Sequence, residues 1–411
     1  MTKAQCRFCK TDLKHSFVDL GMSPLSNSYL KAEQLNQSEK FYPLHTYVCS
    51  KCLLIQLEEF ESPDHIFSDY AYFSSYSNSW LKHCQQYTNL MIEKFSLSQS
   101  SQVIEIASND GYLLQYFHNQ QIPVLGIEPA VNVAKVAIAK GINTTVKFFG
   151  VATAQELVSQ AQQADLLLGN NVLAHVPDIN DFVAGMQIAL KPDGVITMEF
   201  PHLLQLINQN QFDTIYHEHF SYLSLIAVSQ IFAAHDLTIF DVEELPTHGG
   251  SLRIYAKHHD NHQLTISDRL IALQEKEKDA GLDQVQTYLK FSEQVIASKH
   301  KLLSFLIDIK RSGKTIVGYG APAKGNTLLN YCGIRGDFLD YTCDRSPHKQ
   351  GLFLPGTHIP IYAPEQIQVT KPDYVLILPW NLKEEIQEQL AYIRQWDGKF
   401  IVPIPEVEVL E

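Results

Sequence analysis

The chain has 411 residues, of which 45% are hydrophobic and 19% charged, and its formal net charge is -13. This length allows two or three domains with separate cores, and the acidic balance disfavours binding to nucleic acid or to anionic membranes. The N-terminal sequence lacks the apolar stretch of a signal peptide, and no segment has the roughly 18 apolar residues of a membrane span. We therefore expect a cytoplasmic protein, either a monomer or a weak homo-oligomer.

Four of the seven cysteines fall into two CxxC pairs, Cys6 with Cys9 and Cys49 with Cys52. Two thiolates from each pair can form a tetrahedral set of sulfur ligands, for which zinc is the expected metal in a reducing compartment. The long gap between the pairs costs little, because loop-closure entropy grows slowly with length. Unbound thiols or disulfides are the alternatives. Four protein ligands leave no open position, so the sequence predicts one structural zinc ion.

Beyond residue 100 the chain alternates between apolar runs typical of strands and amphipathic runs typical of helices. The first block begins with VIEI and ends with GVITMEF, and a second block begins with TIVGYG and ends with KFIVPI. Such alternation predicts parallel sheets covered by helices. Between the blocks, residues 238–257 read as a β-hairpin turning at Gly249 and Gly250, and residues 265–311 as mainly helical. The turn HGGSLR could allow close approach of a ligand or could be a plain hairpin turn.

The first block carries the layout of a nucleotide-type cofactor site. Its first strand leads into the loop ASNDG, where Gly111 permits a tight turn and close backbone approach to a ligand. Glu128 ends the next strand, where an acid can accept hydrogen bonds from ribose hydroxyls. This layout favours class I S-adenosylmethionine (SAM) binding, with a dinucleotide as the alternative because the loop lacks GxGxG. The candidate cofactor-binding residues are Glu105, Ala107, Asn109, Gly111, Glu128, Asn170 and Asn171.

The second block opens with the loop GYGAPAKGNT after a strand and before an apolar helix. Small residues, backbone amides and a helix N-terminus suit a pyrophosphate, and a lysine adds positive charge. The next strand ends in DRSPHKQG, where sugar or base contacts occur in open α/β sheets. We therefore expect a nucleotide ligand here, whereas the missing GxxxxGK[ST] order disfavours a P-loop. The candidate substrate-binding residues are Gly320, Lys324, Asn326, Asp344, Arg345, His348 and Lys349.

The segment QFDTIYHEHFSYL places Tyr216, His217, Glu218 and His219 side by side between apolar flanks. In a helix Tyr216 shares a face with His219, so part of the cluster can point into a cavity. A histidine with a pKa near neutrality, assisted by a phenol and a carboxylate, can take a proton from carbon or from a hydroxyl. An aromatic helix start with satisfied polar groups is the alternative interpretation.

Together these motifs resemble the sugar C-methyltransferases of deoxysugar biosynthesis, a family that methylates C3 of a nucleotide-linked 4-keto-6-deoxyhexose. The resemblance covers almost the whole chain. It rests on the two CxxC pairs, EIASNDGYLL, GIEPAVNVA, NNVLAHVPD, EFPHLL, QFDTIYHEHFSYLS, THGGSLRIY, GYGAPAKGNTLLNY, DRSPHKQG and DYVLILPWN.

The resemblance implies an α/β architecture with three domains. These are an N-terminal zinc-binding module (1–66), a central class I SAM-methyltransferase domain with a Rossmann-like fold (67–258), and a C-terminal Rossmann-like domain (259–411). The last would bind the nucleotide sugar, which we expect to be linked to TDP or GDP. The implied catalytic residues are Tyr70, His175, Tyr216, Glu218 and His219.

In this interpretation His219 is the base that removes the C3 proton, and Tyr216 aligns it or donates to the carbonyl oxygen. Glu218 and His175 would orient the substrate and the catalytic groups, and Tyr70 would close over SAM. An O- or N-methyltransferase acting on a nucleotide sugar is one alternative. A noncatalytic zinc-containing scaffold protein is another, although the intact cluster at Tyr216 to His219 disfavours it.

Overall fold

The computed structural model of the protein describes residues 4–62, 74–76 and 78–411. The backbone forms two compact units, each assembled from several stretches of the chain. Unit 1 comprises Met1–Leu13, Cys49–His202 and Phe220–Asp283, and unit 2 comprises Lys14–Val48, Leu203–His219 and Gln284–Glu411. The division by sequence at 1–66, 67–258 and 259–411 stays a prediction.

Unit 1 contains a twisted sheet with the strand order β10-β11-β8-β7-β4-β5-β6 within the described residues. All neighbouring pairs are parallel except those that involve β11, which runs antiparallel to β8 and to β10. The strands are β4 (Val103–Ile106), β5 (Val124–Ile127), β6 (Thr144–Thr145), β7 (Ala164–Asn170), β8 (Leu190–Pro201), β10 (Leu237–Leu245) and β11 (Ser251–His258). This arrangement confirms the predicted parallel sheet and the predicted hairpin.

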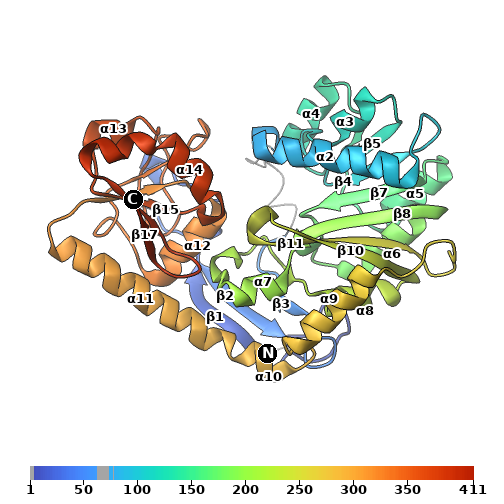
Figure 1. The fold of residues 1–411 in the computed structure, drawn as a ribbon, viewed down its shortest axis with the longest axis horizontal. Helices are drawn as coiled ribbons and strands as arrows, with labels where there is room; N and C mark the ends of the chain where they lie inside the picture. The colour runs from blue at the N-terminus through green and yellow to red at the C-terminus, as the bar shows by residue number, and fades with distance from the viewer. Residues whose placement is uncertain (1–3, 63–73, 77) are drawn as a thin grey trace. The chain divides into compact units, whose positions relative to one another are not determined.

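Helices cover both faces of this sheet (Figure 1). Alternating residues of a strand point to opposite faces, and Val103 and Ile104 accordingly belong to two separate apolar clusters. The cluster around Val103 is covered by α2 (Asn78–Phe95), α3 (Leu114–Asn119) and α4 (Val131–Ala139). The cluster around Ile104 is covered by α5 (Val151–Ser159), α6 (Ile179–Ala189), α8 (Leu225–Ala233) and α9 (Asp268–Asp279). Burial on both faces explains why the central strands are mostly apolar.

A short antiparallel pair and the zinc-ligand turns complete unit 1. Strand β3 (Ile55–Leu57) pairs with β9 (Ser221–Tyr222), so that Ile55 lies opposite Tyr222. Cys6, Cys49 and Cys52 belong to the same apolar cluster as Ile104. The turns that carry the cysteines are therefore packed into the core of unit 1.

Unit 2 contains a second sheet with the order β14-β13-β12-β15-β16-β17 within the described residues. The strands are β12 (Ile316–Tyr319), β13 (Thr342–Cys343), β14 (Ile361–Tyr362), β15 (Tyr374–Ile377), β16 (Lys399–Val402) and β17 (Glu408–Leu410). Only β17 pairs antiparallel to its neighbour, β16, within the described residues. The helices of this unit are α7 (Leu203–Asn208), α10 (Val285–Leu289), α11 (Phe291–Arg311), α12 (Ala323–Cys332), α13 (Gln366–Thr370) and α14 (Lys383–Gln389).

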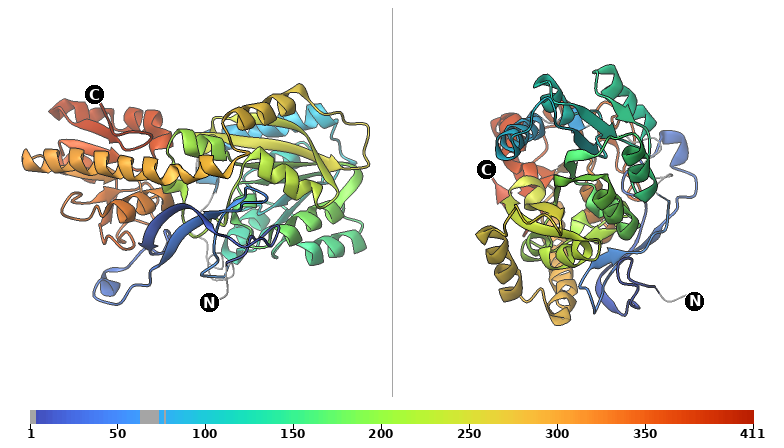
Figure 2. Two further views of the ribbon diagram at one scale, coloured as in Figure 1. Left: turned by 90° about the horizontal axis from the view of Figure 1, so that it is seen from below. Right: turned by 90° about the vertical axis from the view of Figure 1, so that its right-hand side faces the viewer.

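Unit 2 also contains an N-terminal hairpin of β1 (His15–Ser23) and β2 (Tyr42–Val48), which packs against the long helix α11 (Figure 2). The Phe17 ring of β1 stacks on Phe291 of α11 with a centroid distance of 4.5 Å. The segment Leu203–His219, which contains most of the predicted catalytic cluster, lies in this unit. Among the described residues, no helix has both the length and the apolar character that a lipid bilayer requires.

Candidate active site and zinc centre

The two cysteine pairs of unit 1 form a compact sulfur site. The Cys6 and Cys52 sulfurs are 3.5 Å apart, as are those of Cys9 and Cys49, and all four lie within 4.8 Å of one another. Four thiolates bound to one zinc ion at about 2.3 Å would be about 3.8 Å apart, so this set fits tetrahedral zinc. The site is structural, because four protein ligands fill the coordination sphere.

The two zinc-ligand turns have the same local construction. The residue after each pair adopts a left-handed conformation, with φ of 59° at Lys10 and 62° at Leu53. Its amide donates to the carbonyl of the first cysteine, at 2.9 Å for Cys6 and 3.0 Å for Cys49. The Gln56 amide also donates to the Cys6 sulfur at 3.2 Å. Donors of this kind orient thiolate ligands and stabilise their charge.

The predicted SAM loop lies between β4 and α3, at the carboxyl end of the parallel strands. Ala107, Asn109 and Gly111 have φ of 55°, 50° and 75°, which gives the loop a sharply curved backbone. A side chain at Gly111 would contact the Ile142 side chain at 3.0 Å, so close packing adds to the requirement for glycine. The Asn109 side chain accepts the Ser74 amide at 3.0 Å, which ties η2 (Ser74–Tyr76) to the loop.

Glu128 follows β5 and fixes the shape of this loop. Its carboxylate accepts the amide of Asn109 at 2.9 Å and that of Ala130 at 2.8 Å, and burial raises the pKa of Glu128. Each carboxylate oxygen accepts one of these bonds and retains a second lone pair for a ribose hydroxyl. Glu105 differs, because it is fully buried within β4 and burial raises its pKa well above the ordinary value.

Strand β7 pairs with β4, the strand that leads into the SAM loop. Asn170 ends β7 and Asn171 follows it. Asn171 is left-handed with φ of 55°, and its amide donates to the Glu199 carbonyl at 2.7 Å. Among the described residues, the buried Ser108 hydroxyl, the Asn170 amide nitrogen and the Asn171 side-chain oxygen have no protein hydrogen-bond partner. Buried polar groups normally have partners, so these atoms fit a polar cofactor such as SAM.

His175 ends the short helix η3 (Leu173–His175), which follows Asn171 in unit 1. Its amide donates to the Val172 carbonyl at 2.8 Å. The preceding residue, Ala174, accepts the Phe220 amide at 2.8 Å. The half-buried His175 is thus held on an anchored loop of unit 1. Tyr70 lies outside the described residues.

In unit 2, His219 follows the turn η4 (Phe212–Thr214). Its Nδ1 lies 2.8 Å from the Thr214 carbonyl oxygen, which can only accept, so Nδ1 carries the proton and Nε2 is the basic nitrogen. The Tyr216 ring lies against the His219 ring with a centroid distance of 4.0 Å. The His219 amide donates to the Tyr216 carbonyl at 2.9 Å, so one tight turn fixes both side chains.

The two other members of the cluster are buried in different directions. His217 contacts β2, where its Nε2 donates to the Pro43 carbonyl at 3.2 Å, and burial lowers its pKa to about 4. The Glu218 carboxylate accepts the Asn27 side-chain amide at 2.6 Å. Burial raises the pKa of Glu218 to about 7, although the bond from Asn27 favours the ionised form. Glu218 can therefore hold or release a proton near neutral pH.

The loop after β12 gathers three of the predicted substrate residues. The Asp344 carboxylate accepts the Ala321 amide at 2.7 Å, and the Lys349 ammonium donates to the Ala321 carbonyl at 2.8 Å. Gly320 has φ of 91° and adjoins the Pro379 ring, so a side chain would be both strained and obstructed. The Tyr29 hydroxyl also donates to the Ala321 carbonyl, at 2.6 Å.

The other predicted substrate residues lie elsewhere in unit 2. The Lys324 ammonium lies over the Trp380 ring, 4.5 Å from its centroid, and burial lowers the pKa of Lys324 to about 8. The Asn326 amide donates to the Ser26 carbonyl at 2.6 Å. Arg345 and His348 are exposed, and Arg345 lies 3.8 Å from Glu385.

Sequence reasoning missed three residues that support the cluster. Asn27 and Tyr29 lie in the N-terminal segment PLSNSYL, whose only local signal is its turn-forming composition. The third is Asp213, whose buried carboxylate accepts the Trp380 indole N–H at 2.7 Å. Burial raises the pKa of Asp213 to about 6. The partners of these three residues lie far away in the sequence, so no local pattern in the sequence identifies them.

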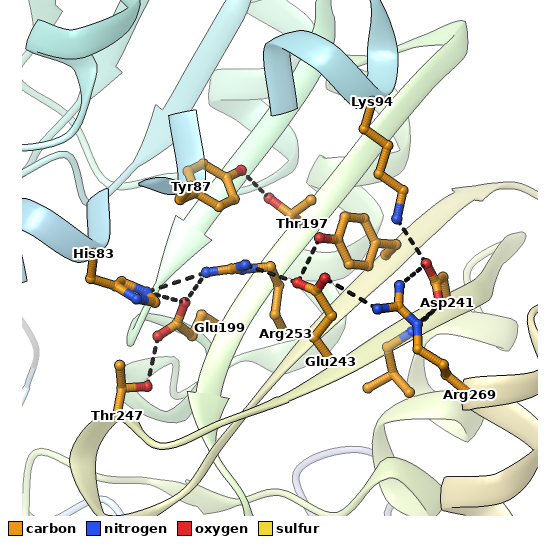
Figure 3. A network of polar contacts seen from close by, with 12 residues as sticks. His83, Tyr87, Lys94, Thr197, Glu199, Asp241, Glu243, Thr247, Arg253 and Arg269 are labelled. Atoms are coloured by element: carbon orange, nitrogen blue, oxygen red, sulfur yellow. Dashed lines mark hydrogen bonds and ion pairs between the residues drawn. The ribbon is translucent and has the colours of Figure 1, made fainter. Parts of the chain in front are cut away.

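A buried polar network lies across the neighbouring strands β8, β11 and β10 of the unit 1 sheet (Figure 3). Glu199 is fully buried, and its carboxylate accepts bonds of 3.0 Å from His83, Arg253 and Thr247. Burial alone would raise the pKa of Glu199, but the His83 bond and the Arg253 charge outweigh it and the pKa is lowered. Arg253 extends the network to Glu243 at 2.9 Å. The network fixes the turn that begins at Thr247.

Three family models match successive parts of the chain. Residues 6–67 match a model described as "Putative zinc binding domain", residues 80–242 a "Methyltransferase domain", and residues 246–405 a "C-methyltransferase C-terminal domain". A curated relative, the C-methyltransferase NovU of Streptomyces niveus, is 34% identical over 407 residues, which are 99% of this chain and 96% of the relative.

Solved structures show lower similarity. The PH0226 protein of Pyrococcus horikoshii is 14% identical with a TM-score of 0.38, over 48% of this chain and 99% of that one. A SAM-dependent methyltransferase of Clostridium acetobutylicum is 9% identical with a TM-score of 0.35, over 43% and 92% of the two chains.

The sheet, the SAM loop and the four-cysteine site, with the matching models, define a SAM-dependent methyltransferase that has a zinc-binding domain. The chain belongs to the C-methyltransferase family, as its similarity to NovU along nearly the whole length of both proteins shows. The family resemblance, the α/β fold class and the two cofactors predicted from the sequence are therefore confirmed.

Proposed function

We propose that this C-methyltransferase methylates C3 of a nucleotide-linked 4-keto-6-deoxyhexose, with His219 as the base. The observation that carries the proposal is the 2.8 Å bond from His219 Nδ1 to the Thr214 carbonyl, which makes Nε2 the basic nitrogen. A histidine whose Nδ1 proton is held by a carbonyl presents Nε2 as the nitrogen that can remove a carbon-bound proton. Similarity to NovU supports transfer to carbon.

The reaction requires the C3 proton to become acidic. Removal of that proton by His219 Nε2 leaves its electron pair in an enolate between C3 and C4, with the negative charge on the C4 oxygen. Tyr216, whose ring adjoins His219, would donate to that oxygen or hold the base in line. A base of this kind supplies roughly 10² to 10⁴ in rate, and one oxyanion donor about 3 kcal/mol.

SAM, when bound, supplies an electrophilic methyl group that accepts the enolate electron pair as its bond to sulfur breaks. We assign its binding to Asn109, Gly111, Glu128, Asn170 and Asn171, with Ala107 shaping the loop and Glu105 supporting it from within β4. His175 and Glu218 would orient the reacting groups, and Tyr70 keeps its predicted role in closing over SAM. No step requires the zinc ion.

For the sugar nucleotide we assign the loop around Ala321, where Gly320, Asp344 and Lys349 meet. The Lys349 ammonium and nearby amides suit a diphosphate, with TDP and GDP as the expected nucleotides. Lys324 and Asn326 would act by supporting the loop and α12. Arg345 and His348 are exposed and would contact the outer part of the ligand.

The test is incubation with SAM and a panel of TDP- and GDP-linked 4-keto-6-deoxysugars, read by mass spectrometry and NMR. We expect the new methyl group on ring carbon C3. His219→Ala should abolish methylation while ligand binding persists, and Tyr216→Phe should reduce it by roughly 10²-fold. His118→Ala, at an exposed position of α3, is the control and should retain activity. A methyl group on oxygen or nitrogen, or near-normal turnover of His219→Ala, would refute the proposal.

A further inference from the structure

Arg7 lies between the zinc ligands Cys6 and Cys9 in the sequence, and its guanidinium bonds to main-chain carbonyls. One guanidinium nitrogen donates to the Pro177 carbonyl at 2.6 Å, and the other donates to the Leu57 carbonyl. Both acceptors are main-chain oxygens in unit 1, so the arginine joins backbone segments that lie far apart in the sequence. Five donors in a fixed plane suit such a bridging role.

The Pro177 carbonyl belongs to the loop that carries His175. This loop has anchors on both sides of the histidine. Ala174 accepts the Phe220 amide at 2.8 Å, and Pro177 accepts Arg7. Beyond Pro177, the Asn180 side chain donates to the carbonyl of Arg7 itself at 3.2 Å. Arg7 takes part in two of these contacts, through its side chain at Pro177 and through its main-chain carbonyl at Asn180, whose amide also donates to the Phe8 carbonyl at 3.0 Å.

Arg7 also contacts Phe220, whose amide donates to the Ala174 carbonyl. Its guanidinium lies over the Phe220 ring, 5.4 Å from the centroid. The Phe220 carbonyl accepts the Leu57 amide at 3.0 Å, and the Leu57 carbonyl in turn accepts Arg7. In the sequence Phe220 directly follows His219, and Ala174 directly precedes His175. Within unit 1, the Arg7 side chain therefore contacts both the His175 loop, at Pro177, and Phe220, whose amide is bound to the residue before His175.

We propose that Arg7 is a positioning residue that couples the zinc-ligand turn to the His175 loop and to Phe220. The zinc ion fixes the turn, the turn fixes the arginine, and the arginine sets the position of His175. This inference rests on the proposed function in assigning His175 a part in the reaction. A displacement of about 1 Å in a catalytic group can cost roughly 10²-fold in rate, so loss of this bridge has a measurable effect.

The test compares Arg7→Met, Arg7→Lys and the control Lys51→Met in the full-length, zinc-loaded protein. Lys51 lies between Cys49 and Cys52 in the second turn, and its side chain is exposed. In Arg7→Met we expect unchanged zinc content and SAM affinity, a similar KM for the sugar, and kcat lowered roughly 10- to 100-fold. Arg7→Lys should recover part of kcat, because its ammonium can bond to one of the two carbonyls. Recovery should be incomplete, because one ammonium cannot reach both. Lys51→Met should match the wild type.

Two readouts separate positioning from general damage. Hydrogen exchange of the Phe220 amide, measured without substrate, should be faster in Arg7→Met and unchanged in Lys51→Met. In a double-mutant cycle with His175→Ala, the Arg7→Met effect on kcat should largely disappear. Activity is measured as total methyl transfer from labelled SAM, whichever atom of the substrate accepts the methyl group. The effect of Arg7→Met on kcat can therefore be measured even if the methyl group is not transferred to C3.

The inference is overturned by any of three results. The first is an Arg7→Met protein that keeps kcat within twofold of the wild type. The second is loss of zinc in parallel with activity, which would make Arg7 a residue of the metal site alone. The third is a full additional loss of kcat from Arg7→Met in the His175→Ala background, which would show that Arg7 does not act through His175.

Discussion

The side-chain amide of Asn27 donates to the carboxylate of Glu218 at 2.6 Å, across 191 positions of the chain. Both residues are in unit 2, and the Tyr29 hydroxyl lies 3.3 Å from the Asn27 side-chain oxygen. Because the same hydroxyl donates to the Ala321 carbonyl, a chain of polar contacts leads from Glu218 to the loop assigned to the nucleotide sugar. The N-terminal segment that contains Asn27 and Tyr29 therefore contacts both Glu218 and that loop.

The pKa of Glu218, raised from 4.5 to about 7, predicts a pH-dependent stability. The folded protein holds this proton more tightly than the unfolded chain does, so the contribution of Glu218 to the free energy of unfolding falls as pH rises from 4.5 to 7. We expect that the free energy of unfolding of the wild type, minus that of Glu218→Gln, decreases by about 3 kcal/mol across this window. Urea unfolding at a series of pH values measures it.

The neighbouring His217 provides a contrast of opposite sign. Its pKa is lowered from 6.5 to about 4, so the unfolded chain binds the proton more tightly and stability rises with pH between 4 and 6.5. The wild type minus His217→Gln should therefore show an increasing difference over that range. If the difference in free energy of unfolding between wild type and variant changed with pH in the same direction for His217→Gln and Glu218→Gln, the assigned directions of the two pKa shifts would be wrong.

Removal of one zinc ligand should unfold the zinc-ligand turns rather than alter the chemical step directly. Cys49→Ser leaves three thiolates, and metal affinity in such sites is coupled to folding. We expect zinc content to fall well below one ion per chain and the melting temperature to drop. The control Cys343→Ser, which replaces a buried cysteine of β13 in unit 2, should retain zinc. Full zinc content in Cys49→Ser would exclude the four-sulfur site.

Much of the fold was predictable because the relevant patterns are local. Strand and helix periods identified both α/β blocks, and the CxxC spacing identified the metal ligands. The hairpin predicted at 238–257 is formed by β10 and β11. By contrast, residues 14–48 lie in unit 2 although the cysteine turns on either side of them lie in unit 1. Periodicity reports which face of an element is buried, not which distant segment covers it.

The same limit explains which site residues could be found. His219 and Tyr216 stand out because their residue types are adjacent in the sequence. Asn27 contributes through a contact of very long sequence separation, and nothing beside it in the sequence indicates its partner. The strand-end pattern grouped Asp344, His348 and Lys349 together, but it did not indicate that His348 would be exposed while Lys349 turns toward Ala321.

Glu128→Ala should weaken SAM binding while nucleotide affinity stays nearly unchanged. The substitution removes both the ribose acceptor proposed here and the two bonds that shape the loop, to Asn109 and Ala130. We expect SAM affinity to fall by about 2 to 3 kcal/mol, the typical cost of hydrogen bonds to a charged group. Calorimetry with each ligand separately measures this, with the exposed Asp193→Ala as the control. Equal loss of both ligands would mean a damaged fold or a wrong assignment of the sites.

The buried network around Glu199 should make Arg253 important for stability. Arg253→Met leaves the fully buried Glu199 carboxylate without the guanidinium that bonds to it at 3.0 Å, and breaking a buried pair from one side typically costs about 3–5 kcal/mol. We therefore expect the free energy of unfolding to fall by about that amount in urea titrations at pH 7. The Glu199→Gln/Arg253→Met double variant should lose less, because the uncompensated charge is also removed.

Arg269→Met removes a guanidinium that is 51% exposed and should cost about 1 kcal/mol or less. Similar losses for Arg253→Met and Arg269→Met would show that burial does not set the strength of this network.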